Sequence, residues 1–231
     1  MCSSDLLNRI IRWTDAGVEY EADPRQHEKL VSELGLEGAK AVVTPVVRPT
    51  QEAICRDVLL DAGKMTHFRG LAARSNYLAA DRPDCAYAAK EVCRWMSAPT
   101  ELGLQGLKRL ARYLVGRPRL VWHYRWQEAS HFDVYSDTDW AGRLRTRKST
   151  SGGCVVIGAH LIKSWSSTQP GLALSSGEAE VVGVTRASAV ALGFRSLLSD
   201  YGAVAVRGRV WTNSSAAIGI CKRQGLGKLG T

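Results

Sequence analysis

The order of elements in the last hundred residues constrains the fold most. Three short apolar stretches, "FDVYSD", "GCVVIG" and "LIKSWSS", indicate strands, and the turn-rich "TRKSTSGG" lies between the first two. A long helical pattern covers residues 176–200 and is followed by Gly202. "RVWTNSSAAIG", residues 209–219, then runs from a strand into a helix. The order strand, strand, strand, helix, strand, helix predicts an α/β (α+β) fold, in which helices pack on a mixed sheet.

The first half of the chain is predicted to be mainly helical. Residues 18–36 indicate a short strand, a turn and a helix, whereas residues 40–52 contain two prolines and are expected to be extended. Two helical stretches follow at about 66–97 and about 100–115, the first of them broken near Arg82-Pro83. "RLVWHYRW" then indicates a further strand.

The second helical stretch combines an apolar stripe with basic faces. Its leucines at positions 104, 107, 110 and 114 share one side, which predicts core packing. Lys108, Arg109 and Arg112 occupy the other faces, and phosphate contact there is a secondary hypothesis. Residues 102–127 contain six lysines or arginines and no acid, in a chain of net charge +9. This surface favours a polyanion such as nucleic acid, with a solvated basic face as an equal alternative.

Composition narrows the classes of protein to consider. Hydrophobic content of 45% and charged content of 23% are typical of soluble globular proteins. No uninterrupted apolar run reaches the ~18 residues of a membrane span, and the amino terminus lacks the apolar core of a signal peptide. We therefore expect an intracellular protein without a membrane partner. The six cysteines form no C-x-x-C pair, which argues against a zinc site or a disulfide framework.

Acidic residues are rare and paired in the last 101 residues. Only six are present, and four of them lie in "SDTDW" and "GEAE". In so basic a segment, such pairing favours a magnesium site, because hard carboxylate oxygens gather around a divalent cation.

Geometry separates the members of each pair. Glu178 lies three residues after Ser175, which predicts a capping box at the start of the helix. Residues two apart on a helix point about 200° apart, so Glu180 faces elsewhere and remains available for chemistry. An exposed helix acid is the alternative for Glu180. The strand that contains Asp137 is expected to end near that residue, which leaves Asp139 to the following loop.

A site of three residues follows from this arrangement. We expect Asp137 from a strand, Glu180 from the long helix and Asn213 from the end of a later strand to meet as metal ligands and catalytic residues. Three carboxylates placed in this way can hold two metal ions across a scissile phosphate. Asn213 offers an amide oxygen and no charge, so the site has two formal negative charges instead of three.

Several motifs together resemble a known family. "YSDTDWAG", "RKSTSG", "SWSSTQP" and "ALSSGEAE" are similar, in order and spacing, to the ribonuclease H region of copia-type retrotransposon Pol polyproteins. "YEADPRQHEKLVSELGL", "YLAADRPDCAYAAKEVCRWMSAPT" and "LKRLARYL" resemble the end of the reverse transcriptase and its connection. The resemblance implies a thumb- and connection-like segment at 1–125 and a ribonuclease H-like domain, truncated at its C-terminus, at 126–231.

The resemblance also implies a function. The family cleaves the RNA strand of RNA–DNA hybrids with Mg²⁺, and its metal-binding carboxylates fall on Asp137 and Glu180, with Asn213 in the third place. The implied partners are an RNA–DNA hybrid or other nucleic acid, with Arg147 and Lys148 as further contacts, and the remainder of a Pol polyprotein.

Three departures from the family pattern affect the expected activity. The third carboxylate is an amide, no Tyr-x-Asp-Asp signature of a polymerase site is present, and the chain stops at "GLGKLGT", before the element that carries the family's fourth ligand. We therefore expect an impaired or inactive ribonuclease H-type nuclease. The alternatives are a catalytically dead nucleic-acid-binding remnant and a host protein that reuses the fold as an interaction module.

Overall fold

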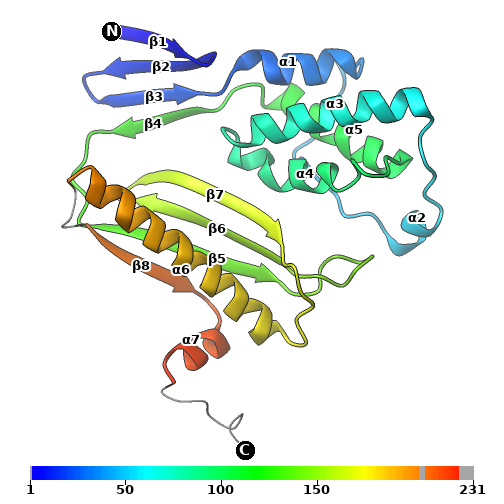
Figure 1. Cartoon of the computed structure of the whole chain (residues 1–231). Coiled ribbons are helices and arrows are strands. Elements are labelled where there is room, and N and C mark those ends of the chain that lie inside the picture. Colours follow the sequence, from blue (N-terminus) through cyan, green and yellow to red (C-terminus); the bar gives the residue numbers. More distant parts are fainter. Residues whose placement is uncertain (1, 203–205, 224–231) are drawn as a thin grey trace, which may run out of the picture. The chain divides into compact units, whose positions relative to one another are not determined.

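The computed structural model describes residues 2–202 and 206–223, and the "GLGKLGT" end lies outside these residues. The chain divides into two compact units, Met1–Trp126 and Gln127–Thr231. Helices, an antiparallel sheet and a mixed sheet are present, so the α/β (α+β) class is confirmed (Figure 1).

The first unit contains the predicted helices. They are α1 (Pro24–Glu33), α3 (Ala62–Ala79), α4 (Pro83–Cys93) and α5 (Glu101–Gly116). The short α2 (Gln51–Cys55) was not predicted, and it begins within the segment 40–52 that was expected to be extended. The break at Arg82-Pro83 is where α4 begins, because proline fits the first turn of a helix and disfavours a helical residue before it. The leucine stripe of α5 packs into the core, as predicted: Leu107, Leu110 and Leu114 are buried and Leu104 is partly buried.

The same unit contains a four-stranded antiparallel sheet, of which two strands were not predicted. Its order is β1 (Cys2–Leu6), β2 (Arg9–Thr14), β3 (Gly17–Glu21) and β4 (Val121–Arg125). Asp81, which follows α3, connects the helices to the sheet through hydrogen bonds. Its carboxylate accepts hydrogen bonds from Arg9 Nε at 2.8 Å and from the Tyr20 hydroxyl, and its carbonyl accepts one from Trp122 Nε1 at 3.4 Å.

The second unit has the predicted order of elements. Strands β5 (His131–Asp139), β6 (Thr150–Ile157) and β7 (His160–Thr168) form an antiparallel meander, and β8 (Arg207–Thr212) pairs in parallel with β5. The sheet order is β7-β6-β5-β8. The expectation that Asp139 lies in a loop is wrong. The ladder with β6 continues to the pair Asp139–Thr150, so β5 extends two residues beyond Asp137.

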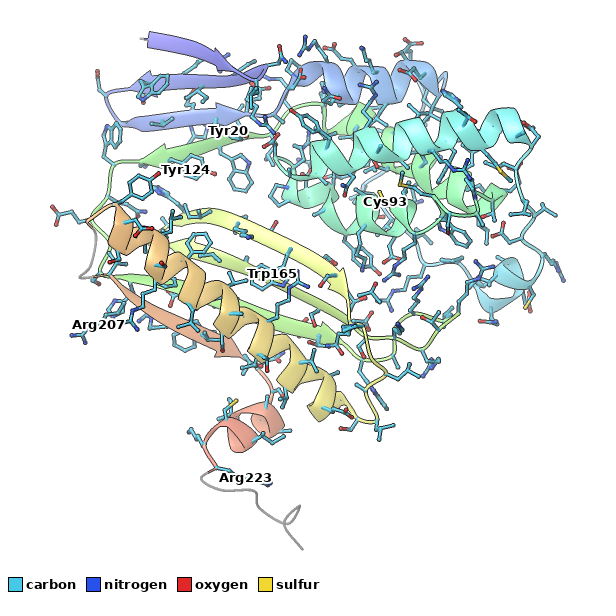
Figure 2. The ribbon with its side chains drawn as sticks, in the orientation of Figure 1. Tyr20, Cys93, Tyr124, Trp165, Arg207 and Arg223 are labelled. Carbon is cyan, nitrogen blue, oxygen red and sulfur yellow. The ribbon has the colours of Figure 1, made fainter. Side chains whose placement is uncertain are left out.

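Helix α6 (Ser176–Asp200) lies across one face of this sheet, and the short α7 (Ser215–Cys221) follows β8 (Figure 1). Ala187 of α6 joins Phe132, Val134 and Val155 in the core of the unit. Trp165 of β7 packs against the same core (Figure 2). Among the residues described, α6 alone is long and apolar enough to cross a membrane, and one such helix is weak evidence because soluble core helices also pass this test.

Candidate metal centre

Asp137 and Asn213 come from neighbouring parallel strands. The register pairs Ser136 of β5 with Thr212, the last residue of β8, so the next residues along the two strands are Asp137 and Asn213. Both side chains are exposed. Parallel strands present their carboxyl ends at the same edge of a sheet, where α/β proteins place ligands. The geometry therefore puts two of the three expected residues at one edge of the sheet.

Asn213 lies between β8 and α7, in a short connection that two hydrogen bonds hold in place. Ser214 donates its backbone N–H to Thr212 Oγ1 at 3.2 Å, and Ser214 Oγ accepts from the backbone N–H of Ala217 at 3.2 Å, which caps α7. The Asn213 amide takes part in neither bond and stays exposed at the sheet edge.

Helix α6 separates its two glutamates as the helical spacing predicts. Ser175 Oγ accepts from the backbone N–H of Glu178 at 3.1 Å, and Glu178 Oε2 accepts from the backbone N–H of Leu174 at 2.7 Å. Glu178 is exposed and stabilises the start of the helix. Glu180 is only 9% exposed, so the alternative of an exposed helix acid is wrong.

The electrostatic environment of Glu180 is unfavourable for a carboxylate. Burial raises its pKa, the negative charge of Asp137 raises it further, and a hydrogen bond from the Thr138 backbone lowers it in part. Its Oε2 is buried without a hydrogen-bond partner. A buried anionic oxygen in this state lacks compensation for the water it has lost, and a cation would supply that compensation.

Small and polar residues around Glu180 were not identified from the sequence. Ser136 Oγ and Thr138 Oγ1 are also buried without hydrogen-bond partners. Both hydroxyls approach Gly183, one turn along α6 from Ala179. Gln169, after β7, donates hydrogen bonds to Ser151 and to the first turn of α6. These residues carry no periodic signal, because the contacts that matter join distant parts of the chain.

The five residues expected to bind nucleic acid fall into two groups. Three of them hold connecting segments through backbone carbonyls: Arg109 Nε donates to Thr44 at 3.1 Å, Arg112 Nε to Lys40 at 2.8 Å and Lys148 Nζ to Pro170 at 2.6 Å. Lys108 and Arg147 are exposed. Their side chains remain available for contact with a polyanion, whereas the other three already have structural roles.

Within residues 2–202 and 206–223, no group of three His, Cys, Asp or Glu side chains could hold a metal ion. Asp137 and Glu180 are two carboxylates, and the third expected ligand, Asn213, is an amide. The donor set therefore suits a divalent cation less well than three carboxylates would.

Comparison with known proteins places the chain in a family. No family model and no solved structure matches it. It is 38% and 36% identical, over 165 residues or 71% of its length, to the retrovirus-related Pol polyproteins from transposons RE1 and RE2 of Arabidopsis thaliana. It is 25% identical, over 219 residues or 93% of its length, to the Pol polyprotein from transposon TNT 1-94 of Nicotiana tabacum, of which it covers 16%. The chain spans 11% of the length of the two Arabidopsis relatives. On these similarities, the chain belongs to the retrovirus-related Pol polyproteins of copia-type transposons.

Proposed function

We propose that the unit of residues 127–231 is a ribonuclease H-like domain that binds a divalent cation through Asp137 and Glu180 and has an impaired hydrolytic activity. The observation that carries the proposal is the Glu180 carboxylate, which is buried beside the end of β5 with Oε2 unpartnered and with Asp137 close enough to raise its pKa. Two neighbouring carboxylates repel each other, and a cation bound between them relieves this repulsion.

Mg²⁺ fits the donor set, because carboxylate and amide oxygens are the hard ligands it takes in proteins. Asp137 and Glu180 would bind it through charged oxygens, and Asn213 through its neutral carbonyl oxygen. The chemistry that bound divalent cations supply at such a site is activation of water and stabilisation of the leaving oxygen of a phosphodiester. With Asn213 in the third position, the residues oppose this positive charge with one negative charge fewer, which explains the expected impairment.

The substrate class in this proposal is the RNA strand of an RNA–DNA hybrid. The family membership supports this substrate. A Pol polyprotein of a retrovirus-related transposon copies RNA into DNA, and an RNA–DNA hybrid is an intermediate of that copying. The phosphate backbone would be bound by exposed cations such as Lys108 and Arg147.

Cleavage of a fluorescently labelled RNA–DNA hybrid tests the proposal. We expect slow cleavage with Mg²⁺ or Mn²⁺, and this cleavage should be lost in Glu180→Gln. Glu178→Gln is the matched control, because it removes a carboxylate two residues away on the same helix that caps the helix instead of facing β5. Cleavage that survives Glu180→Gln, or that both variants abolish equally, would contradict the assignment of Glu180.

A second candidate is a catalytically dead nucleic-acid-binding remnant. The exposed side chains of Lys108 and Arg147 favour it, since binding requires them and not the carboxylates. Hybrid binding that falls with increasing salt, together with no detectable cleavage and no Mn²⁺ binding, would select this candidate over an impaired nuclease.

A further inference from the structure

Gln169 is a buried glutamine whose two amide hydrogens are both used. It follows β7 directly and is 4% exposed. Its Nε2 donates one hydrogen bond to Ser151 Oγ at 2.9 Å and one to the backbone carbonyl of Ala179 at 2.8 Å. Its own backbone N–H donates to the carbonyl of Ser149 at 2.9 Å. One side chain thus joins strand β6 to the first turn of helix α6.

Both acceptors of this amide are next to the proposed cation site. Ser151 pairs in the sheet with Thr138, the neighbour of Asp137 in β5. Ala179 is the neighbour of Glu180 in α6. Asp137 in β5 and Glu180 in α6 are therefore connected through strand β6 and the Gln169 amide, which bonds to the first turn of α6.

Glu180 depends on such a connection for its orientation. Its Oε2 has no hydrogen-bond partner, so no donor fixes that oxygen. The carboxylate does accept a hydrogen bond from the Thr138 backbone of β5, and this bond forms only while α6 stays close to the sheet. Removing a group that orients a metal ligand without contacting the metal commonly weakens metal binding by roughly 10–100-fold.

We infer that Gln169 is a positioning residue of the Asp137–Glu180 pair, holding the first turn of α6 against β6 so that Glu180 stays beside the end of β5. The inference rests on the proposed cation site. It assigns Gln169 no contact with substrate or cation.

Two glutamine variants separate positioning from a general structural role. Gln169→Met keeps the length of the side chain and removes both donors. Gln127→Met is the matched control: Gln127 Nε2 donates to the Ile157 carbonyl at 2.7 Å, and its Oε1 accepts from the Ala159 backbone at 3.0 Å. These bonds lie at the other end of β6 in the same unit, away from the Asp137 end of β5.

The readout is the affinity for Mn²⁺ alone, measured by water proton relaxation with the full chain, both unchanged and carrying Asn213→Asp. We expect Gln169→Met to weaken Mn²⁺ binding about tenfold, and Gln127→Met to change it less than about twofold. Urea unfolding of each variant measures the loss of stability. Equal losses of Mn²⁺ affinity in the two variants, or no loss in Gln169→Met, would overturn the inference.

The outcome is distinguishable from a failure of the proposed function. Mn²⁺ binding that depends on Glu180 and Gln169 without any cleavage of hybrid would refute the nuclease activity and support the positioning role. No Mn²⁺ binding in either background would refute the cation site, and the positioning role with it.

Discussion

Gly183 of α6 lies so close to β5 that a Cβ placed on it would stand 2.6 Å from Thr138 Oγ1 and 3.0 Å from Ser136 Oγ. This close approach brings the first turns of α6 down to the sheet. It also explains why the glutamate one turn earlier is buried beside a strand instead of extending into solvent.

Gly183→Ala should therefore destabilise the second unit. Alanine favours a helix over glycine by about 1 kcal/mol, but displacing the two hydroxyls costs about 1–3 kcal/mol. We expect a net loss of about 1 kcal/mol in the free energy of unfolding, measured with urea. Gly193→Ala, on the same helix with nothing within 4 Å of the added Cβ, should instead be neutral or stabilising. Equal effects of the two substitutions would argue against the tight contact.

Glu180→Gln should stabilise the metal-free protein at pH 7, by about 1 kcal/mol, because it removes a buried, incompletely bonded charge. Burial and Asp137 raise the pKa of Glu180, so the folded state holds its proton to a higher pH than the unfolded state. The penalty is then absent below the ordinary pKa of glutamate and is complete above the raised one. Unfolding curves from pH 4 to pH 8 would show the gain of the variant growing with pH. A gain independent of pH would contradict this cause.

Asp23 should stabilise the first unit in a pH-dependent way. It caps α1, is 2% exposed and accepts from the Arg25 backbone and Nε, each at 3.0 Å, and from Gln26 Nε2 at 2.9 Å. The Arg25 side chain is the main cause that lowers the pKa of Asp23 to about 2. Its stabilisation is complete above the unfolded value of 3.8 and is lost as the pH falls toward about 2. Asp23→Asn should cost about 1–2 kcal/mol at pH 7, and the difference should shrink below pH 3.8 and vanish only below about pH 2. A constant difference across this range would contradict the assignment.

Adjacent basic residues on α5 should behave differently in hybrid binding. Lys108→Ala should weaken binding of an RNA–DNA hybrid, lower the salt dependence by about one phosphate contact and leave stability unchanged. Arg109→Ala removes the bonds to the Thr44 carbonyl and hydroxyl, at 3.1 and 2.8 Å, and should lower the free energy of unfolding. Fluorescence anisotropy at several salt concentrations, paired with urea unfolding, checks both. Weaker hybrid binding in Arg109→Ala together with lower stability in Lys108→Ala would contradict this assignment of roles.

Asn213→Asp should increase the affinity for Mn²⁺ by about tenfold, which corresponds to about 1.4 kcal/mol. The reason is that a third negative charge is added at the edge where β5 and β8 end. Water proton relaxation measures the affinity. Asn213→Ser, a small neutral replacement, is the control and should not increase it. An unchanged affinity in Asn213→Asp would mean that residue 213 lies too far from the two carboxylates to share a cation.

The sequence predicts those features of the fold that depend on local chemistry. Ser175 and Glu178 mark the start of α6 because a cap and its partner lie three residues apart, and the same spacing assigns Glu180 to another face. The order of elements predicts a mixed sheet, and the parallel pair of β8 with β5, which α6 connects, makes the sheet mixed.

Features that depend on distant contacts or on unusual turns were not predictable. Strands β1 and β2 are joined by Leu7 and Asn8, both at positive φ, where Asn-Gly is the usual signal and leucine is rare. Gln169 is one polar residue in a polar segment, and its role depends on Ser151 and Ala179, which approach it only in the folded chain. The local sequence pattern around Gln169 does not indicate such contacts.

From the parallel pairing of β8 we expect a particular order in which the candidate site assembles. β5, β6 and β7 are consecutive and can pair as hairpins, whereas β8 reaches β5 only after the whole of α6 has been traversed. We expect this distant contact to form later in folding than the hairpins, because a longer loop must be closed first. Asp137 and Glu180 would then meet before Asn213 joins them. Brief detachment of β8 and α7 would release the amide while the two carboxylates stay together.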